Sequence, residues 1–142
     1  MGTYKKRLVL VLAAVIFIIA VPATIYFAGT FGNDTQYVMY IGTNDKDIYM
    51  QLIPTDEAKA IVNEICARHV GGYTVSTAEG GWVDGNGILT QETTLIYVFT
   101  NASETQMYAI MDEAIAALNQ SSILIEKRYV TSTFYGGKEF SR

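Results

Sequence analysis

The residues best suited to chemistry are concentrated between positions 74 and 92. This stretch holds Thr74, Glu79, the only tryptophan of the chain, Trp82, and Glu92. Two neighbouring carboxylates can share a cation or a proton, an indole ring can stack on a ligand, and a threonine hydroxyl can donate and accept hydrogen bonds. We therefore take these four residues as candidate ligand-binding residues. The alternative for Trp82 is packing at a sheet edge.

The two glutamates raise a question of strand register. If the flanking strands pair without interruption and Val83 faces Ile88, Glu79 lies opposite Glu92, and like charges in that position destabilise a sheet. A β-bulge at Gly80-Gly81 would separate them, since glycine within a strand commonly marks a bulge. A shared cation, a shared proton or a basic partner would also relieve the repulsion. We expect the bulge.

A second polar pair lies near the end of the chain. Glu126 and Arg128 are two residues apart in a predicted strand, so they share one face. There they could pair with each other or hold a polar ligand, and we include both among the candidate ligand-binding residues. The alternative is a solvated strand face.

The remaining reactive residue types fit structural roles. His69, the only histidine, is expected to cap a helix end, and Cys66 to be a small core residue. Asn44, Asp45 and Asp47 resemble the start of a calcium loop, but the required glycine and closing glutamate are absent at the right distances. No nucleophile has recognisable partners. We therefore predict no catalytic residue, no cofactor and no metal.

The pattern of apolar residues predicts the elements that carry these side chains. Strands are expected at Thr35–Thr43, Tyr73–Trp82, Ile88–Thr100 and Ile123–Phe134, and helices at Thr55–His69 and Ser103–Leu118. Both helices show the i, i+3, i+4 spacing of an amphipathic helix, and the strands are rich in β-branched and aromatic residues.

Local signals mark several boundaries. Thr55 can cap the first helix and Gly71-Gly72 can end it. Ser103 and Gln106 form the S-x-x-Q pattern of a capping box at the start of the second helix. Asp84-Gly85-Asn86-Gly87 supplies the residues that tight hairpin turns need.

The order β-α-β-β-α-β predicts an α+β, ferredoxin-like fold. In this fold two helices cover one side of a four-stranded antiparallel sheet, and the other side is open. The open face is then solvated, paired with another copy, or used to bind a partner.

The start of the chain predicts where the protein works. Lys5, Lys6 and Arg7 precede an uncharged, mostly apolar run over residues 8–28. As a helix this run is roughly 31 Å long, which matches the ~30 Å hydrocarbon core of a bilayer. The sequence therefore predicts a single-pass protein of the cell membrane. The positive-inside rule places its N-terminus in the cytoplasm and the residues after the span outside the cell. The alternative is a signal peptide cleaved near Val21-Pro22-Ala23, which would leave a secreted protein.

Four segments follow from this interpretation. Residues 1–29 form a basic stub and a transmembrane signal-anchor, 30–36 a linker, 37–135 an extracytoplasmic α+β domain, and 136–142 a polar tail. After position 30 there are seven basic residues against all 14 acidic ones, a formal charge of −7, which excludes nucleic acid as a natural partner.

The residues around the hairpin also resemble a known family. Three short segments are similar to the pattern of a family of small secreted bacterial proteins classed as a domain of unknown function. They are Gly72-Tyr73-Thr74-Val75, then Gly81-Trp82, then Glu92 before an apolar strand. A proline that this family has before the threonine is absent here. The resemblance implies an extracytoplasmic α+β domain and supplies no reaction.

Three functions remain open. The first, which we prefer, is a membrane-anchored, extracytoplasmic binding or interaction module that uses the open sheet face or the hairpin for a protein partner or a homo-oligomer. The second is a small-ligand or metal sensor built around Glu79, Trp82, Glu92 and Arg128. The third is a small hydrolase that uses the carboxylates with water.

Overall fold

The computed structural model describes residues 34–83, 85–134 and 136, and residues 34–130 of these form one compact unit. In chain order its elements are β1 (Asp34–Gly42), α2 (Thr55–His69), β2 (Thr74–Val83), β3 (Leu89–Thr100), α3 (Glu104–Ala117) and β4 (Leu124–Val130). The predicted order is confirmed. Among the described helices, none is long and apolar enough to cross a membrane, and the predicted span at 8–28 lies outside the described residues.

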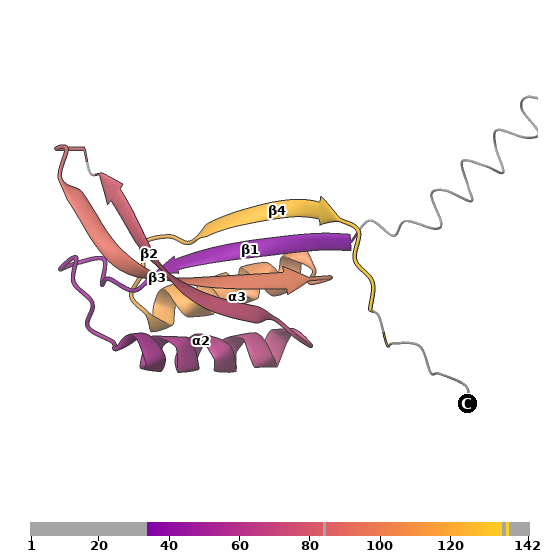
Figure 1. Cartoon of the computed structure of the whole chain (residues 1–142). Helices are drawn as coiled ribbons and strands as arrows, with labels where there is room; N and C mark the ends of the chain where they lie inside the picture. Colours follow the sequence, from indigo (N-terminus) through magenta and orange to yellow (C-terminus); the bar gives the residue numbers. More distant parts are fainter. Residues whose placement is uncertain (1–33, 84, 135, 137–142) are drawn as a thin grey trace, which may run out of the picture. The chain divides into compact units, whose positions relative to one another are not determined.

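The four strands form one antiparallel sheet in the order β2-β3-β1-β4. The two described helices, α2 and α3, lie against the same face of this sheet, and neither of them covers the opposite face (Figure 1). The predicted ferredoxin-like arrangement is therefore confirmed, including its open face.

The core lies between the sheet and the helices. Successive strand residues point to opposite faces, so alternate residues of β1 and β3 enter it, and both helices add a stripe of apolar residues. The members with no exposed surface are Met39, Ile41, Val62, Cys66, Leu95, Tyr97, Phe99, Ile110 and Ala114. Burying each large side chain contributes about 1.5–3 kcal/mol, so this layer holds the sheet rigid beneath the open face.

The helix boundaries confirm one prediction and correct two. The capping box of α3 is present: the Ser103 hydroxyl accepts from the Gln106 N–H at 3.2 Å, and the Gln106 side chain accepts from the Ser103 N–H at 2.8 Å. Thr55 does not cap α2, because it is already helical and Pro54 precedes it without a side-chain cap. Nor do the glycines end α2, since the chain turns extended one residue earlier, at Val70.

The register of the β2–β3 hairpin corrects the expected bulge. Val83 pairs with Leu89 rather than Ile88, so the connection is one residue longer than predicted, and the ladder runs uninterrupted through both glycines. Glu79 now faces Thr93, while Glu92 faces Gly80. The glutamates therefore point to opposite faces of the sheet, and this separates their charges without a bulge.

Two further features concern the ends of the sheet. Strand β4 stops at Val130, short of the predicted Phe134, and Val130 is its last residue that pairs with β1, opposite Asp34. At the other end, the tip of the β2–β3 hairpin projects past the helices (Figure 1). Val83 and Leu89 are accordingly about 60% exposed, at 61% and 59%.

Candidate functional site

A pocket of about 760 Å³ lies on the open face, at the end of the sheet where β1 finishes. Its floor is formed by the strands, including Tyr40 of β1, Ile96 of β3 and Leu124 of β4. The rim is formed by the segment after β1, by residues 120–122 after α3, and by the β2–β3 hairpin at Trp82. Volumes of this size are typical of small-molecule sites.

Two glycines make room for polar groups in the floor. A Cβ atom placed on Gly42 would overlap the carboxylate of Glu92, and one placed on Gly80 would overlap the hydroxyl of Thr94. Glycine within a strand often marks such a close approach. The missing side chains therefore allow a carboxylate and a hydroxyl to lie where a larger residue would fill the sheet surface.

The Glu92 carboxylate is held by the chain that follows β1. Its Oε2 atom accepts a hydrogen bond from the Asn44 N–H at 3.2 Å. The Asn44 side chain in turn donates to the Gln91 carbonyl at 3.2 Å, and the Thr43 hydroxyl donates to the Thr93 carbonyl at 2.9 Å. These bonds fasten the end of β1 to β3, and so fix the carboxylate against the pocket floor.

The loop that forms the rim is built around Asp45. One oxygen of its carboxylate accepts from the N–H groups of Asp47 and Ile48, at 2.9 and 3.3 Å. The other accepts from the Asn119 side chain at 2.9 Å, and the same amide also donates to Asp47 at 2.8 Å. The hydrogen bond from Asn119, followed by that from the Asp47 backbone, lowers the pKa of Asp45, so this residue stays ionised as a structural anchor.

Gln120, which follows α3, also holds this loop by a hydrogen bond. Its side chain is buried and donates to the Asn44 carbonyl at 2.7 Å, and the neighbouring Asn119 carbonyl accepts from the Lys46 N–H at 3.1 Å. The rim is thus tied to the end of α3 by both side-chain and backbone bonds. A loop held in this way presents its outer residues in a fixed position, which is preorganisation for binding.

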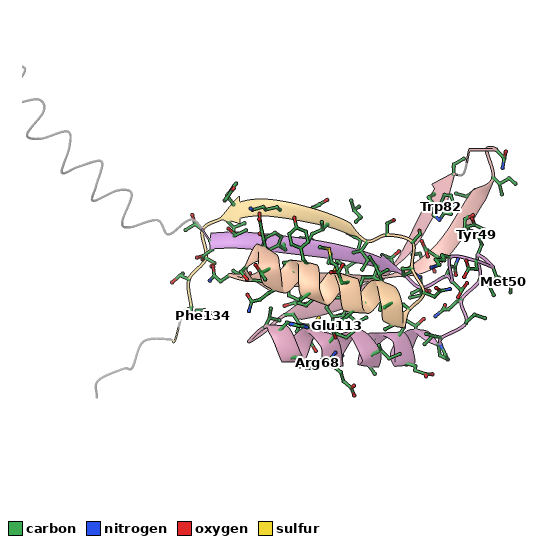
Figure 2. The ribbon with its side chains drawn as sticks, turned by 180° about the vertical axis from the view of Figure 1, so that it is seen from behind. Tyr49, Met50, Arg68, Trp82, Glu113 and Phe134 are labelled. Carbon is green, nitrogen blue, oxygen red and sulfur yellow. The ribbon has the colours of Figure 1, made fainter. Side chains whose placement is uncertain are left out.

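Tyr49 and Trp82 face each other across the rim. Their ring centroids are 6.2 Å apart at an interplanar angle of 51°, and both side chains lie at the hairpin end of the domain (Figure 2). The rings stay 60% and 42% exposed. Tyr49 has a φ of +56°, a conformation that costs roughly 1–2 kcal/mol for a residue with a side chain, and strain of this kind is often found at binding sites.

The predicted ligand-binding residues are divided between two places. Trp82 and Glu92 line the pocket, and Glu79 borders it although its register directs its side chain to the other face. The other three, Thr74, Glu126 and Arg128, are not in the pocket lining. By register they share the open face with Glu92, further along the strands, and the last two form an ion pair with each other.

The remaining predicted roles are settled by contacts in the helix layer. His69 lies in the last turn of α2, the helix end at which it was predicted, and its Nε2 atom lies 2.6 Å from Glu113 of α3, which also pairs with Arg68. These bonds, from His69 first and then from Arg68, lower the pKa of Glu113. Cys66 is fully buried, as predicted, and burial raises its pKa to about 12.

Sequence reasoning missed the residues that shape the pocket. The sequence analysis places Gly42 in a strand, considers Asn44 only as the possible start of a calcium loop, and assigns no role to Tyr49. The signal that could have identified Gly42 is its position inside a β-branched and aromatic strand, where a glycine suggests that another group approaches closely. Within the described ranges, no group of three His, Cys, Asp or Glu side chains is placed to hold a metal ion.

Comparisons with known proteins bear on the fold. No protein-family model matches the chain, and no curated protein matches it. Among solved structures, a phage SAM lyase in complex with S-methyl-5'-thioadenosine is 16% identical, with a TM-score of 0.51 over 73% of this chain and 94% of that chain. The apo state of a phage SAM lyase is 15% identical, with a TM-score of 0.47 over 73% of this chain and 94% of that chain. CutA from Synechococcus elongatus is 14% identical, with a TM-score of 0.36 over 72% of this chain and 80% of that chain. At these identities the likeness to the first structure is one of fold.

Proposed function

We propose that this protein is a membrane-anchored, extracytoplasmic binding module that takes a small molecule in the open-face pocket. Residues 8–28 serve as the anchor in this proposal, and the folded domain lies outside the cell membrane. The observation that carries the binding role is the floor of the pocket, where Gly42 and Gly80 leave space for the Glu92 carboxylate and the Thr94 hydroxyl.

The surroundings of this floor support recognition of a ligand. Ligand sites combine apolar and aromatic walls with a few polar groups in fixed positions. Here Tyr40, Tyr49 and Trp82 supply aromatic surface, Glu92 and Thr94 supply polar atoms, and hydrogen bonds from Asn119 and Gln120 hold the rim in place.

Binding is favoured over hydrolysis by the surroundings of the reactive side chains. Among the described residues, Cys66 is buried in the core and His69 is engaged with Glu113, both on the helix side of the sheet. Glu79 and Glu92 point to opposite faces. An activated nucleophile or an acid and base pair needs partners within hydrogen-bond reach, and these groups are too dispersed to form one.

The fold neighbour supplies a rational first probe. That protein is described in complex with S-methyl-5'-thioadenosine, a compound that combines a flat nitrogen-rich ring with a short apolar tail. A flat ring can stack on Tyr49 or Trp82, and an amino group can donate to Glu92. We would therefore include this compound in any ligand screen.

The test is a screen of fragment-sized compounds and S-methyl-5'-thioadenosine by ligand-observed NMR on the full chain. We compare the parent with Ala78→Phe, which fills the pocket floor, and with Thr74→Phe, which adds the same ring to the same face of β2 outside the pocket. We expect hits with the parent and with Thr74→Phe that disappear in Ala78→Phe. A parent without hits, or hits that Ala78→Phe retains, would contradict the proposal.

A further inference from the structure

We infer that the pocket selects an organic cation, meaning a positively charged nitrogen group attached to a small apolar or aromatic body. This inference rests on the proposed function and adds the charge class of the ligand. Three features of the pocket point to it: the fixed carboxylate, the exposed aromatic rings, and the charge balance of the lining.

The carboxylate of Glu92 is positioned as a counter-ion. The Asn44 N–H occupies one position on its Oε2 atom, whereas a carboxylate has about four acceptor positions on its two oxygens. Because Glu92 lines the pocket, the remaining acceptor positions are available to a donor that enters it. A cation that enters gains a Coulomb attraction to this charge, as choline does through its quaternary nitrogen, and a cation that carries an N–H gains a charge-assisted hydrogen bond as well.

The aromatic rings suit the same kind of ligand. The face of a tryptophan or tyrosine ring attracts a cation within about 6 Å of its centroid, and the attraction persists at exposed sites. Tyr49 and Trp82 lie on the rim with their rings tilted against each other, and Tyr40 lines the floor. A cation held by Glu92 thus has ring surface around it.

The charges of the lining disfavour an anion. Asp45 and Glu92 line the pocket and Glu79 borders it with its side chain on the other face of the sheet, against one basic residue, Lys46 on the exposed loop. No arginine is among the described lining residues. The acidic balance of the sequence after position 30 adds an attractive field for cations and a repulsive one for anions.

The experiment separates charge from shape with three compounds of nearly equal form. Choline is cationic, 3,3-dimethyl-1-butanol is its neutral isostere, and 3,3-dimethylbutanoate is an anion of similar shape. Each is titrated into the full chain, with the fluorescence of Trp82, the only tryptophan, as the signal. We expect choline to bind about tenfold more tightly than the alcohol, which corresponds to an ion pair plus one or two ring contacts, and the anion to bind most weakly.

Variants assign the preference to Glu92. Glu92→Gln keeps an acceptor for the Asn44 N–H but loses the charge, and Gly42→Ala displaces the carboxylate without removing it. Both should abolish the tenfold preference. Glu126→Gln removes the same charge from the open face outside the pocket and should preserve it. Circular dichroism confirms that each variant is folded.

The outcomes distinguish this inference from the proposed function. Equal binding of choline and the alcohol, tighter binding of the anion, or a preference that survives both Glu92→Gln and Gly42→Ala would refute cation recognition. Lack of saturable binding by all three compounds would refute it as well. If fragments still bind in the pocket in the NMR screen, only the cation inference has failed; if none do, the binding function itself has failed.

Discussion

Gln106 links the two helices, and replacing it with glutamate gives a sharp test of that link. Its side-chain oxygen accepts from the Ser103 N–H, which closes the capping box of α3. Its side-chain nitrogen donates to the carbonyl of His69, the last residue of α2, at 2.6 Å. Glutamate can replace glutamine in a capping box, but it has no N–H to donate to that carbonyl. Gln106→Glu therefore keeps one bond and breaks the other.

The change in stability has one sign if Gln106 serves only the capping box and the opposite sign if its bond to His69 also stabilises the fold. If Gln106 served only the capping box, a negative charge in the first turn of α3 would be neutral or stabilising, by about 0.3–1 kcal/mol. The bond to His69 predicts destabilisation instead, because a partly buried carbonyl loses its donor and faces a carboxylate. Losing a hydrogen bond of this kind costs about 1–3 kcal/mol. With a urea m-value of about 1.5 kcal/mol/M, we expect the midpoint to fall by about 0.7–2 M.

The assay is urea unfolding of parent and variant, followed by circular dichroism at neutral and at acidic pH. The new carboxyl faces a carbonyl oxygen, so we expect its pKa in the folded state above its usual value of about 4.3. With a raised pKa, Gln106→Glu is less stable than the parent at any pH above the pKa of the new carboxyl in the folded state. This loss of stability disappears below the pKa of the carboxyl in the unfolded state, where the protonated acid can again donate to the His69 carbonyl. An unchanged or raised midpoint at pH 7, or a deficit that does not shrink in acid, would refute this account.

Two further predictions concern groups with shifted pKa values. Cys66, with a pKa of about 12 and no exposed surface, should not react with a thiol reagent at pH 8 until the chain unfolds, and rapid modification without urea would contradict its place in the core. Glu113 has a lowered pKa, so its bonds to His69 and Arg68 stabilise the fold above pH ~4.3, and this stabilisation is lost as the pH falls through the folded pKa. Glu113→Gln should therefore flatten the dependence of the urea midpoint on pH below about 4.3, and parallel curves for parent and variant would show that these bonds add nothing to stability.

Much of the fold could be predicted because local sequence and tertiary structure agree. Ser103 and Gln106 identify the start of α3 by themselves, and the apolar residues of α2 and α3 recur with the helical period that their buried stripes require. Errors of one or more residues arose where the boundary depends on a distant partner. The last strand, for example, ends at Val130, the last of its residues that pairs with β1.

The candidate site could be predicted only in part, for a related reason. Trp82 and Glu92 drew attention as unusual residue types, and both line the pocket. Their neighbours Gly42 and Tyr49 belong to another part of the chain, and only the register of β1 and β3 brings them together with Glu92. One residue in the length of a hairpin connection decides whether Glu92 faces Glu79 or Gly80, and no local signal fixes that length.

The projecting hairpin gives the pocket two walls of unequal local stability. The central part of its floor belongs to strands β1 and β3, which are backed by the buried layer of both helices, whereas Trp82 lies on the part of β2 that extends past the helices (Figure 2). Segments with few buried apolar contacts open more readily than the core to which they are attached. A molecule bound between Glu92 and Trp82 would bridge these two regions, so its binding would stiffen the hairpin tip, where the apolar side chains of Val83 and Leu89 are exposed.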